Sequence, residues 1–459
     1  MFEKNKDKSS SDTNEPAKTD KKKKSSDYIG AEVDFAKSGE VTGIRFLEPL
    51  RVNIWLSLLI LLMTGFGLLM LFSASIPRGY TDESDPFYYV IRQGGFMLLG
   101  ILIGAVISML PIRLFDHIGF VIAVYTMTLG LAVATLFFGN VINGARRWVS
   151  IGSLSFQPSE LIKVGLVFCV AGYRSFVQRQ RKAGKLHYQG KRISKKTFDA
   201  LVDIVIPGGL LLIVMAFVLA QPHVSCFGIL VFVCGVCFFC SGISLSSWLR
   251  GAGMLFAVVA ILVGIVFLFN IMDIQQKAKQ NFAHFFTRID IFNQMNSDET
   301  EEEESDEDDE ASYQSQQSLI AIGSGGLTGV GLGNSRQKYQ YLPEQHNDYI
   351  FSILCEELGF VGGAMVIVLF GLLLFAGMAI AWRANSLFSR ILAVGYTSLL
   401  CFQAFYNIGV ALSIVPPTGM TLPFFSYGGT ANFFFMIAVG LLLSVSRSGV
   451  KRKSVEVRV

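Results

Sequence analysis

The sequence predicts an all-α polytopic membrane protein with about ten transmembrane helices and a large extracellular loop between spans 7 and 8. The first observation is composition, because 52% of the 459 residues are hydrophobic and only 16% are charged, which is unusual for a soluble domain. The second is that long apolar stretches recur, and roughly 20 apolar residues cross a hydrocarbon core of about 30 Å as a helix. The third is that these stretches do not alternate with polar residues, which favours helices over a barrel.

The predicted spans follow one another along a membrane domain that covers residues 47–447. They lie at about 52–73, 94–111, 118–138, 158–173, 203–220, 224–242, 252–271, 358–382, 389–414 and 429–446. Residues 1–46 are rich in Lys, Asp, Ser and Thr and cannot bury enough apolar surface to fold. We therefore expect a disordered tail before the first span. The apolar stretch that follows this tail, at about 52–73, is too long to be the hydrophobic region of a secretory signal peptide.

Orientation follows from the basic residues of the short loops. The loop 174–200 contains nine Lys and Arg residues and one acid, Asp199, and the tail 448–459 is also basic. Short loops with this bias stay in the cytoplasm, and ten spans put both tails on the same side as that loop. Both termini are therefore predicted to be cytoplasmic. The opposite face receives the loops 74–93, 139–157, 272–350 and 415–428.

Two arginines break the charge bias on the outer face. Arg146 and Arg147 lie in "NGARRWVSIG", within an outer loop. They could extend their charged ends to lipid headgroups. Alternatively, their planar forks of donors could bind a phosphate.

The fourth span begins with polar residues. In "SFQPSELIKV", Pro158 is a good first helical residue, and Ser159 and Glu160 fall in the first turn. Lys163 follows about one turn inside the membrane. Glu160 and Lys163 share a helix face and could simply pair with each other. An ionisable pair at a membrane edge is also a candidate functional site.

The outer segment 272–350 divides into two parts. Residues 298–310, "DETEEEESDEDDE", hold eleven acids in thirteen positions and are expected to be extended, solvated and disordered. The glycine-rich part that follows is expected to be ordered at the membrane surface. Its "GSGGLTGVGLG" lacks the Gly-Lys-Ser/Thr of a phosphate loop, and Arg336 and Lys338 are better placed to meet anionic headgroups. The segment ends in "YLPEQHNDYIF", which holds Glu344, His346 and Asp348.

One more irregular stretch lies on the same face, "SIVPPTGMTLPFFSYGG" at 413–429. Broken backbone near membrane depth is tolerated where it is buried in protein or lines a cavity, so we expect the outer loops to converge on one cavity. Cys234, Cys237 and Cys240 lie within a predicted span and are expected to be small buried apolar residues, not metal ligands. The basic segments lack interleaved aromatic residues, so no nucleic-acid binding is predicted.

Three blocks of the sequence resemble the signatures of one bacterial family. They are "NGARRWVSIGSLSFQPSELIKVG", "QSLIAIGSGGLTGVGLGNSRQKYQYLPEQHNDYIFSILCEELGFVG" and "NIGVALSIVPPTGMTLPFFSYGG". They look like those of the shape, elongation, division and sporulation (SEDS) family, the FtsW/RodA/SpoVE group, in order from about residue 47 to 447. "NSRQK" and "HND" look closer to the division-type FtsW branch.

The resemblance implies a peptidoglycan glycosyltransferase that polymerises lipid II on the outer face of the cytoplasmic membrane. It implies a class B penicillin-binding protein as the transpeptidase partner, contacts with other divisome or elongasome proteins, and a divalent cation, Mg²⁺ or Mn²⁺, as helper. The essential Asp of the family's "LPE-x-H-x-D" pattern falls on Asp348. The candidate substrate-binding residues are Arg146, Arg147, Gln157, Ser159, Glu160, Lys163, Arg336, Lys338, Glu344, His346, Ser426 and Tyr427.

Glycan extension needs a base near the attacking hydroxyl and cations near the pyrophosphate. Asp348 can be that base, although it can also cap the eighth helix. The family usually has Gln-Pro-Asp where this chain has Gln221, Pro222 and His223, so one outer carboxylate is missing. The alternative function is a lipid II flippase or a non-catalytic division scaffold. The predicted spans carry few charges and the polar groups gather on one face, which favours catalysis there.

Overall fold

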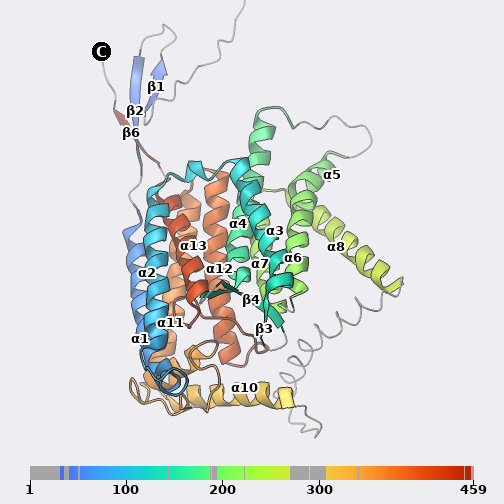
Figure 1. Cartoon of the computed structure of the whole chain (residues 1–459). Coiled ribbons are helices and arrows are strands. Elements are labelled where there is room, and N and C mark those ends of the chain that lie inside the picture. Colours follow the sequence, from blue (N-terminus) through green and yellow to red (C-terminus); the bar gives the residue numbers. More distant parts are fainter. Residues whose placement is uncertain are drawn as a thin grey trace, which may run out of the picture. The chain divides into compact units, whose positions relative to one another are not determined.

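The structure is a computed structural model that falls into two compact units, residues 50–449 and residues 1–49 with 450–459. The residues that it describes are 31–35, 41–49, 52–142, 145–151, 154–186, 188, 194–221, 223–268, 289, 306–339, 341–448 and 450–455. The first unit is mostly helical (Figure 1).

The helical unit confirms the predicted fold class. Its helices are α1 (Ile54–Asp82), α2 (Tyr88–Met109), η1 (Ile112–Leu114), α3 (Ile118–Phe138), α4 (Pro158–Lys182), α5 (Lys195–Ala200), the π-helical η2 (Leu201–Val205), α6 (Ile206–Leu219), α7 (Val224–Phe239), α8 (Leu245–Leu268), α10 (Asp306–Ser324), α11 (Ile350–Arg383), α12 (Leu387–Ala411) and α13 (Gly429–Arg447). Every predicted span coincides with a helix. In the described part of the chain, seven helical segments are long and apolar enough to cross a membrane, and two further apolar helices are shorter.

Helix α12 is the most buried of these segments, with 78% of its apolar window inside the protein. It packs against α4, α7, α11 and α13. Two of its polar residues, Gln403 and Asn407, are almost completely buried. A helix in this position can present polar side chains to several neighbouring elements at once.

Helix α11 begins at Ile350, earlier than the predicted position 358, and is interrupted at Gly359. This residue has φ 68° and ψ −165°, a conformation that glycine adopts readily. A Cβ atom here would lie 2.4 Å from the backbone nitrogen of Gly329. The preceding loop therefore packs against the backbone of the kink, and Phe360 donates a backbone hydrogen bond to Gly326 at 2.8 Å. Hydropathy cannot detect this early start, because residues 350–357 include Glu356 and Glu357.

Helix α10, in yellow, lies across one end of the bundle in Figure 1 and packs against α11. Its first residues, 306–310, belong to the acidic run that was expected to be extended and disordered, so for them this prediction is wrong. Acidic residues are favoured at a helix N-terminus, which is a physical reason for the difference. Residues 298–305 of the run lie outside the described part.

Two small antiparallel sheets were not predicted. The loop between α3 and α4 forms β3 (Asn140–Ile142), β4 (Ala145–Ile151) and β5 (Leu154–Phe156) in the order β3-β4-β5, with Val141 opposite Arg146 and Val149 opposite Phe156.

The other sheet belongs to the second unit. It joins β1 (Ala31–Phe35), β2 (Val41–Pro49) and β6 (Val450–Val455) in the order β1-β2-β6, with Ala31 opposite Phe46 and Ile44 opposite Val455. The structure therefore differs from the predicted disorder at residues 31–35 and 41–46. These stretches contain β-branched and aromatic residues that favour strands. Residues 1–30 lie outside the described residues.

Candidate functional site

Three of the four loops predicted to share the outer face meet at one end of the bundle. Tyr427, before α13, donates its backbone N–H to the carbonyl oxygen of His346, before α11, at 2.8 Å. Gln93 of α2 donates its side-chain amide to the carbonyl oxygen of Ser426 at 3.1 Å. These contacts join the loops 74–93, 272–350 and 415–428, while the convergence of loop 139–157 with them and a cavity between the loops stay predictions.

Asp348 lies two residues before α11. The N-cap residue of α11 is Tyr349, and it makes no side-chain capping hydrogen bond, so the structure does not support Asp348 as the cap. The Asp348 carbonyl oxygen accepts a hydrogen bond of 2.7 Å from the Asn407 side chain. A Cβ atom at Gly419 would lie 3.4 Å from Oδ2 of Asp348. The half-buried Asp348 therefore has its carboxylate beside the loop between α12 and α13.

The start of α4 follows the prediction, with Pro158 at its first turn. Glu160 Oε2 and Lys163 Nζ form an ion pair of 2.8 Å, with side chains 7% and 2% exposed. The simple pairing that sequence spacing allows is therefore present. Yet the buried Ser159 Oγ makes no hydrogen bond to a nitrogen or oxygen atom of a described residue, and Glu160 Oε2 has the Lys163 ammonium as its partner. Buried polar groups normally have such partners, so this end of α4 has unused hydrogen-bonding capacity.

Two amide side chains of α12 connect these elements. Lys163 donates to Oε1 of Gln403 at 2.6 Å, and Gln403 donates to the carbonyl oxygen of Thr421 at 3.1 Å. One turn later, Asn407 donates to the carbonyl oxygens of both Asp348 and Met420. Residues four apart lie on the same helix face. Helix α12 therefore brings the Lys163 side chain and the Asp348 backbone to successive turns of one face.

The two arginines of the α3–α4 loop lie on β4, which contacts α3 and α4. The Arg146 side chain is exposed and donates to the carbonyl oxygen of Leu136 at 3.1 Å, whereas Arg147 is half-buried. At the start of α4, Gln157 and His223 make a side-chain hydrogen bond of 3.0 Å. His223 therefore contacts the N-cap residue of α4, the helix that carries Glu160 and Lys163.

His346 lies in an aromatic cluster. Its ring centroid is 4.8 Å from that of Tyr89 and 5.7 Å from that of Tyr427. Burial, aided by the positive charge of Arg78, lowers the pKa of His346 to about 3, so the imidazole is neutral at neutral pH. Nearby Glu344 has φ 56° and its carboxylate lies 3.7 Å from Arg78. A positive φ at a non-glycine residue is uncommon and often marks a functional segment.

Ser426 shapes the loop that precedes α13. Its hydroxyl oxygen accepts from the backbone N–H of Leu422 at 2.7 Å, and its carbonyl oxygen accepts from Asn432 at 2.9 Å. Asn432 also accepts from the backbone N–H of Phe424, a buried residue with φ 71°. Ser426, which the sequence predicted to bind substrate, therefore helps to hold a loop whose backbone has a positive φ at Phe424.

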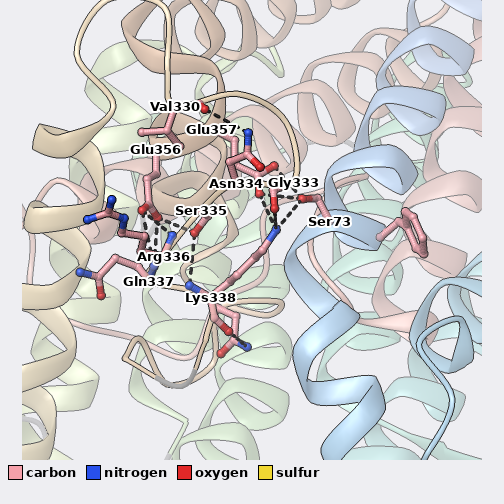
Figure 2. Close-up of polar contacts among 12 residues, drawn as sticks. Ser73, Val330, Gly333, Asn334, Ser335, Arg336, Gln337, Lys338, Glu356 and Glu357 are labelled. Carbon is pink, nitrogen blue, oxygen red and sulfur yellow. Dashed lines mark hydrogen bonds and ion pairs between the residues drawn. The ribbon is translucent and has the colours of Figure 1, made fainter.

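Lys338 is buried in the protein. The prediction that its side chain meets anionic headgroups is therefore wrong. Its side chain is 1% exposed, and its ammonium contacts Glu357 at 2.9 Å, the carbonyl oxygen of Gly333 at 2.6 Å and Ser73 of α1 at 3.3 Å (Figure 2). Burial makes an unpaired charge costly, and here the charge has three partners. Lys338 therefore joins the loop to α1 and α11.

The neighbouring Glu356 completes this arrangement. Its carboxylate accepts from the Ser335 hydroxyl and from the backbone N–H groups of Arg336 and Gln337 (Figure 2). The Arg336 side chain is exposed, so only its backbone takes part. We call Ser73, Ser335, Lys338, Glu356 and Glu357 the loop anchor.

Sequence reasoning missed the amides of α12 and the glutamates of the loop anchor. Gln403 and Asn407 interrupt a long apolar run, and polar residues within a span are costly and often functional. That signal could have identified them. Among the described residues, no group of three or more His, Cys, Asp or Glu side chains could hold a metal ion.

Several known proteins are similar to this chain in sequence. Residues 53–451 match the family described as cell cycle protein, the FtsW/RodA/SpoVE family. Stage V sporulation protein E of Bacillus subtilis is 31% identical over 398 residues, which cover 86% of this chain and 97% of that protein. A protein of Haemophilus influenzae called probable peptidoglycan glycosyltransferase FtsW is 32% identical over 398 residues, covering 86% and 89%.

Solved structures are similar as well. One comes from work on the structural coordination of polymerization and crosslinking by a peptidoglycan synthase complex; it has a TM-score of 0.60 and 27% identity, covering 86% of this chain and 98% of that one. The rod shape determining protein RodA of Thermus thermophilus has a TM-score of 0.56 and 27% identity, covering 86% and 97%. With the family match over most of its length, the chain belongs to the FtsW/RodA/SpoVE family of multi-pass membrane proteins.

Proposed function

We propose that this chain is a peptidoglycan glycosyltransferase that polymerises lipid II on the outer face of the cytoplasmic membrane, for cell division or cell shape. The observation that carries the proposal is that Lys163 and Asp348 contact successive turns of α12 through Gln403 and Asn407. A buried cation and a carboxylate beside a polar loop are the groups that this transfer needs. The name of the Haemophilus influenzae relative supports the same activity.

In the proposed reaction, the 4-hydroxyl of one lipid-linked disaccharide attacks the anomeric carbon of another. The new glycosidic bond forms while the bond to the pyrophosphate oxygen breaks. Asp348 accepts the proton of the attacking hydroxyl, and undecaprenyl pyrophosphate leaves with the bonding electrons. Lys163, Arg146, Arg147 and Arg336 offset the negative charges of the pyrophosphates. Lys338 has no such role, because its charge is used within the loop anchor.

The remaining candidates contribute carboxylates, hydrogen-bonding groups and a neutral imidazole to substrate binding. Glu160 orients Lys163, and Gln157 and Ser159 offer hydrogen-bonding atoms beside it. His346, which burial keeps neutral, lies with Tyr427, Ser426 and Glu344 on the neighbouring loops. Mg²⁺ is usually held by one or two carboxylates together with substrate phosphates. A divalent ion would supply further charge neutralisation, and the steps proposed here use only the chain's own groups.

The partner that we propose is a class B penicillin-binding protein, which would cross-link the strands that this chain makes. The similar structure from a peptidoglycan synthase complex, which couples polymerization and crosslinking, supports this class of partner. Other divisome or elongasome membrane proteins would join the same assembly.

The proposed orientation puts both termini in the cytoplasm and the site outside. Cysteine substitutions at the exposed positions Ala183 and Tyr339 test it, because an impermeant thiol reagent on intact cells should label position 339 only. Labelling of both positions from the outside would overturn this orientation.

The activity test uses the purified chain, alone and with its transpeptidase, and labelled lipid II. We expect glycan strands from the parent and a loss of about 10²–10⁴ in rate for Asp348→Asn, which removes the base. A parallel assay measures movement of labelled lipid II across vesicles. Lipid transport without glycan strands would favour the flippase, and neither activity would favour the scaffold.

A further inference from the structure

Asn407 is a polar residue in an apolar helix at a position where it is almost completely buried, with an exposed fraction of 1%. Its Nδ2 atom donates to the carbonyl oxygen of Asp348 at 2.7 Å and to that of Met420 at 2.6 Å. Carbonyl oxygens only accept, so these two partners fix which end of the amide carries the hydrogens. Both donor hydrogens are used.

These two hydrogen bonds join two loops that are far apart in the sequence. One loop carries Asp348, and the other carries Gly419, whose added Cβ would lie 3.4 Å from the Asp348 carboxylate. Asp348 is not the N-cap residue of α11, so its place is not fixed by a position within the helix. The amide of Asn407 holds the backbone on both sides of the carboxylate from a rigid helix.

We propose that Asn407 is a positioning residue for Asp348: by holding the carbonyl oxygens of residues 348 and 420 together, it fixes where the catalytic carboxylate meets the acceptor hydroxyl. This inference rests on the proposed glycosyltransferase function. Misplacement of a reacting group by about 1 Å can cost roughly 10²-fold in rate. Asn407 acts on the base and not on lipid binding, so its loss should lower kcat and leave KM unchanged.

The test compares Asn407→Leu and Asn407→Asp in the full chain with its transpeptidase partner. Leucine has a similar size and no donor, and aspartate has the same shape but sets an acceptor against two carbonyl oxygens. Both should lower kcat for lipid II polymerisation about 100-fold with KM unchanged. Hydrogen exchange should become faster in residues 341–349 and 418–421 and stay as in the parent in α2. The matched control is Thr397→Val, which removes another buried polar group of α12 and should retain the parental kcat.

A second pair of variants tests the same contact without touching α12. Alanine at Gly419 makes an ordinary van der Waals contact with the Asp348 carboxylate and should be tolerated, whereas Gly419→Val should crowd it and lower kcat. Parental kcat in folded Asn407→Leu and Gly419→Val would overturn the inference. Equal loss in Thr397→Val, or faster exchange throughout the protein, would also overturn it by indicating general destabilisation. If the parent polymerises and Asp348→Asn does not, these failures concern Asn407 alone; no activity in the parent would contradict the proposed function.

Discussion

Two buried lysine–glutamate pairs lie in the described part of the chain, and they differ in how completely they are bonded. Lys338 and Glu357 are 1% and 0% exposed. The Lys338 ammonium has three partners, and both oxygens of Glu357 accept from Ser73. Every group in this pair is engaged by protein.

The pair Lys163–Glu160 is also almost buried, but its surroundings are less complete. Lys163 donates to Gln403 and pairs with Glu160 Oε2, while the neighbouring buried Ser159 Oγ makes no hydrogen bond to a nitrogen or oxygen atom of a described residue. Buried ion pairs are stable only when further hydrogen bonds satisfy their remaining capacity. The complete pair therefore holds the loop in place, whereas the incomplete pair is the one that we propose for ligand binding.

The largest expected effect is the loss of protein stability when the complete pair, Lys338–Glu357, is broken. Lys338→Met leaves Glu357 buried without its cation and should destabilise the protein by about 3–5 kcal/mol. The yield and the thermal midpoint of the purified protein measure this loss. In the double variant Lys338→Met/Glu357→Leu both charges are gone, and most of the stability should return. A stable single variant would contradict the assigned role of the pair.

The second prediction tests whether the incomplete pair, Lys163–Glu160, serves activity and not folding. Lys163→Met/Glu160→Gln removes both charges and should fold, but it lacks the cation that offsets pyrophosphate charge. We expect polymerisation to fall about 10²–10³-fold, as for loss of a preorganised electrostatic group. The readout is glycan synthesis at matched amounts of monodisperse protein. Parental activity would mean that both pairs are structural.

The third prediction concerns the pH dependence of protein stability and depends on the buried His346. The folded pKa of His346 is about 3 and its unfolded value is about 6.5, so the unfolded state binds the proton first. The stability from neutral His346 is therefore complete above pH 6.5 and is lost as the pH falls. Between pH 7 and 5 this loss should be about 2 kcal/mol.

The control for this experiment is His346→Gln, which cannot take up the proton. Arg78, Asp82, Tyr89 and Tyr427 surround the imidazole and remain in both proteins. The difference in stability between parent and variant should shrink as the pH falls from 7 to 5. A difference that does not change with pH would mean that His346 is not held neutral by burial.

The smallest effect tests how far the ligand-binding charges extend beyond Lys163. Replacing Arg146 and Arg147 together with Gln should raise KM for lipid II roughly tenfold, equivalent to about 1.4 kcal/mol, because the exposed Arg146 is screened by solvent. Arg113→Gln, at the opposite end of the bundle, is the control. An unchanged KM would leave the two arginines as surface anchors.

Local signals allowed much of the fold to be predicted. Continuous apolar runs located the spans, and Pro158 marked the start of α4, because these features depend on neighbouring residues. Asp348 followed from a motif and not from physics, and its catalytic role remains a proposal. The burial of Lys338 could not be predicted, since its partners Glu357 and Ser73 are 19 and 265 positions away. The same holds for Asn407, whose partner Asp348 is 59 positions away.

The kink at Gly359 also bears on how the protein responds to its lipid environment. As a straight rod the 34 residues of α11 would measure about 51 Å at 1.5 Å per residue, well beyond a hydrocarbon core of roughly 30 Å. The part after Gly359 is long enough to cross that core alone. The shorter part, which follows Asp348 and carries Glu356 and Glu357, is anchored to protein by the loop contacts. We therefore expect thicker or thinner bilayers to be accommodated by tilt of the part after the kink, with little change in the geometry around Asp348.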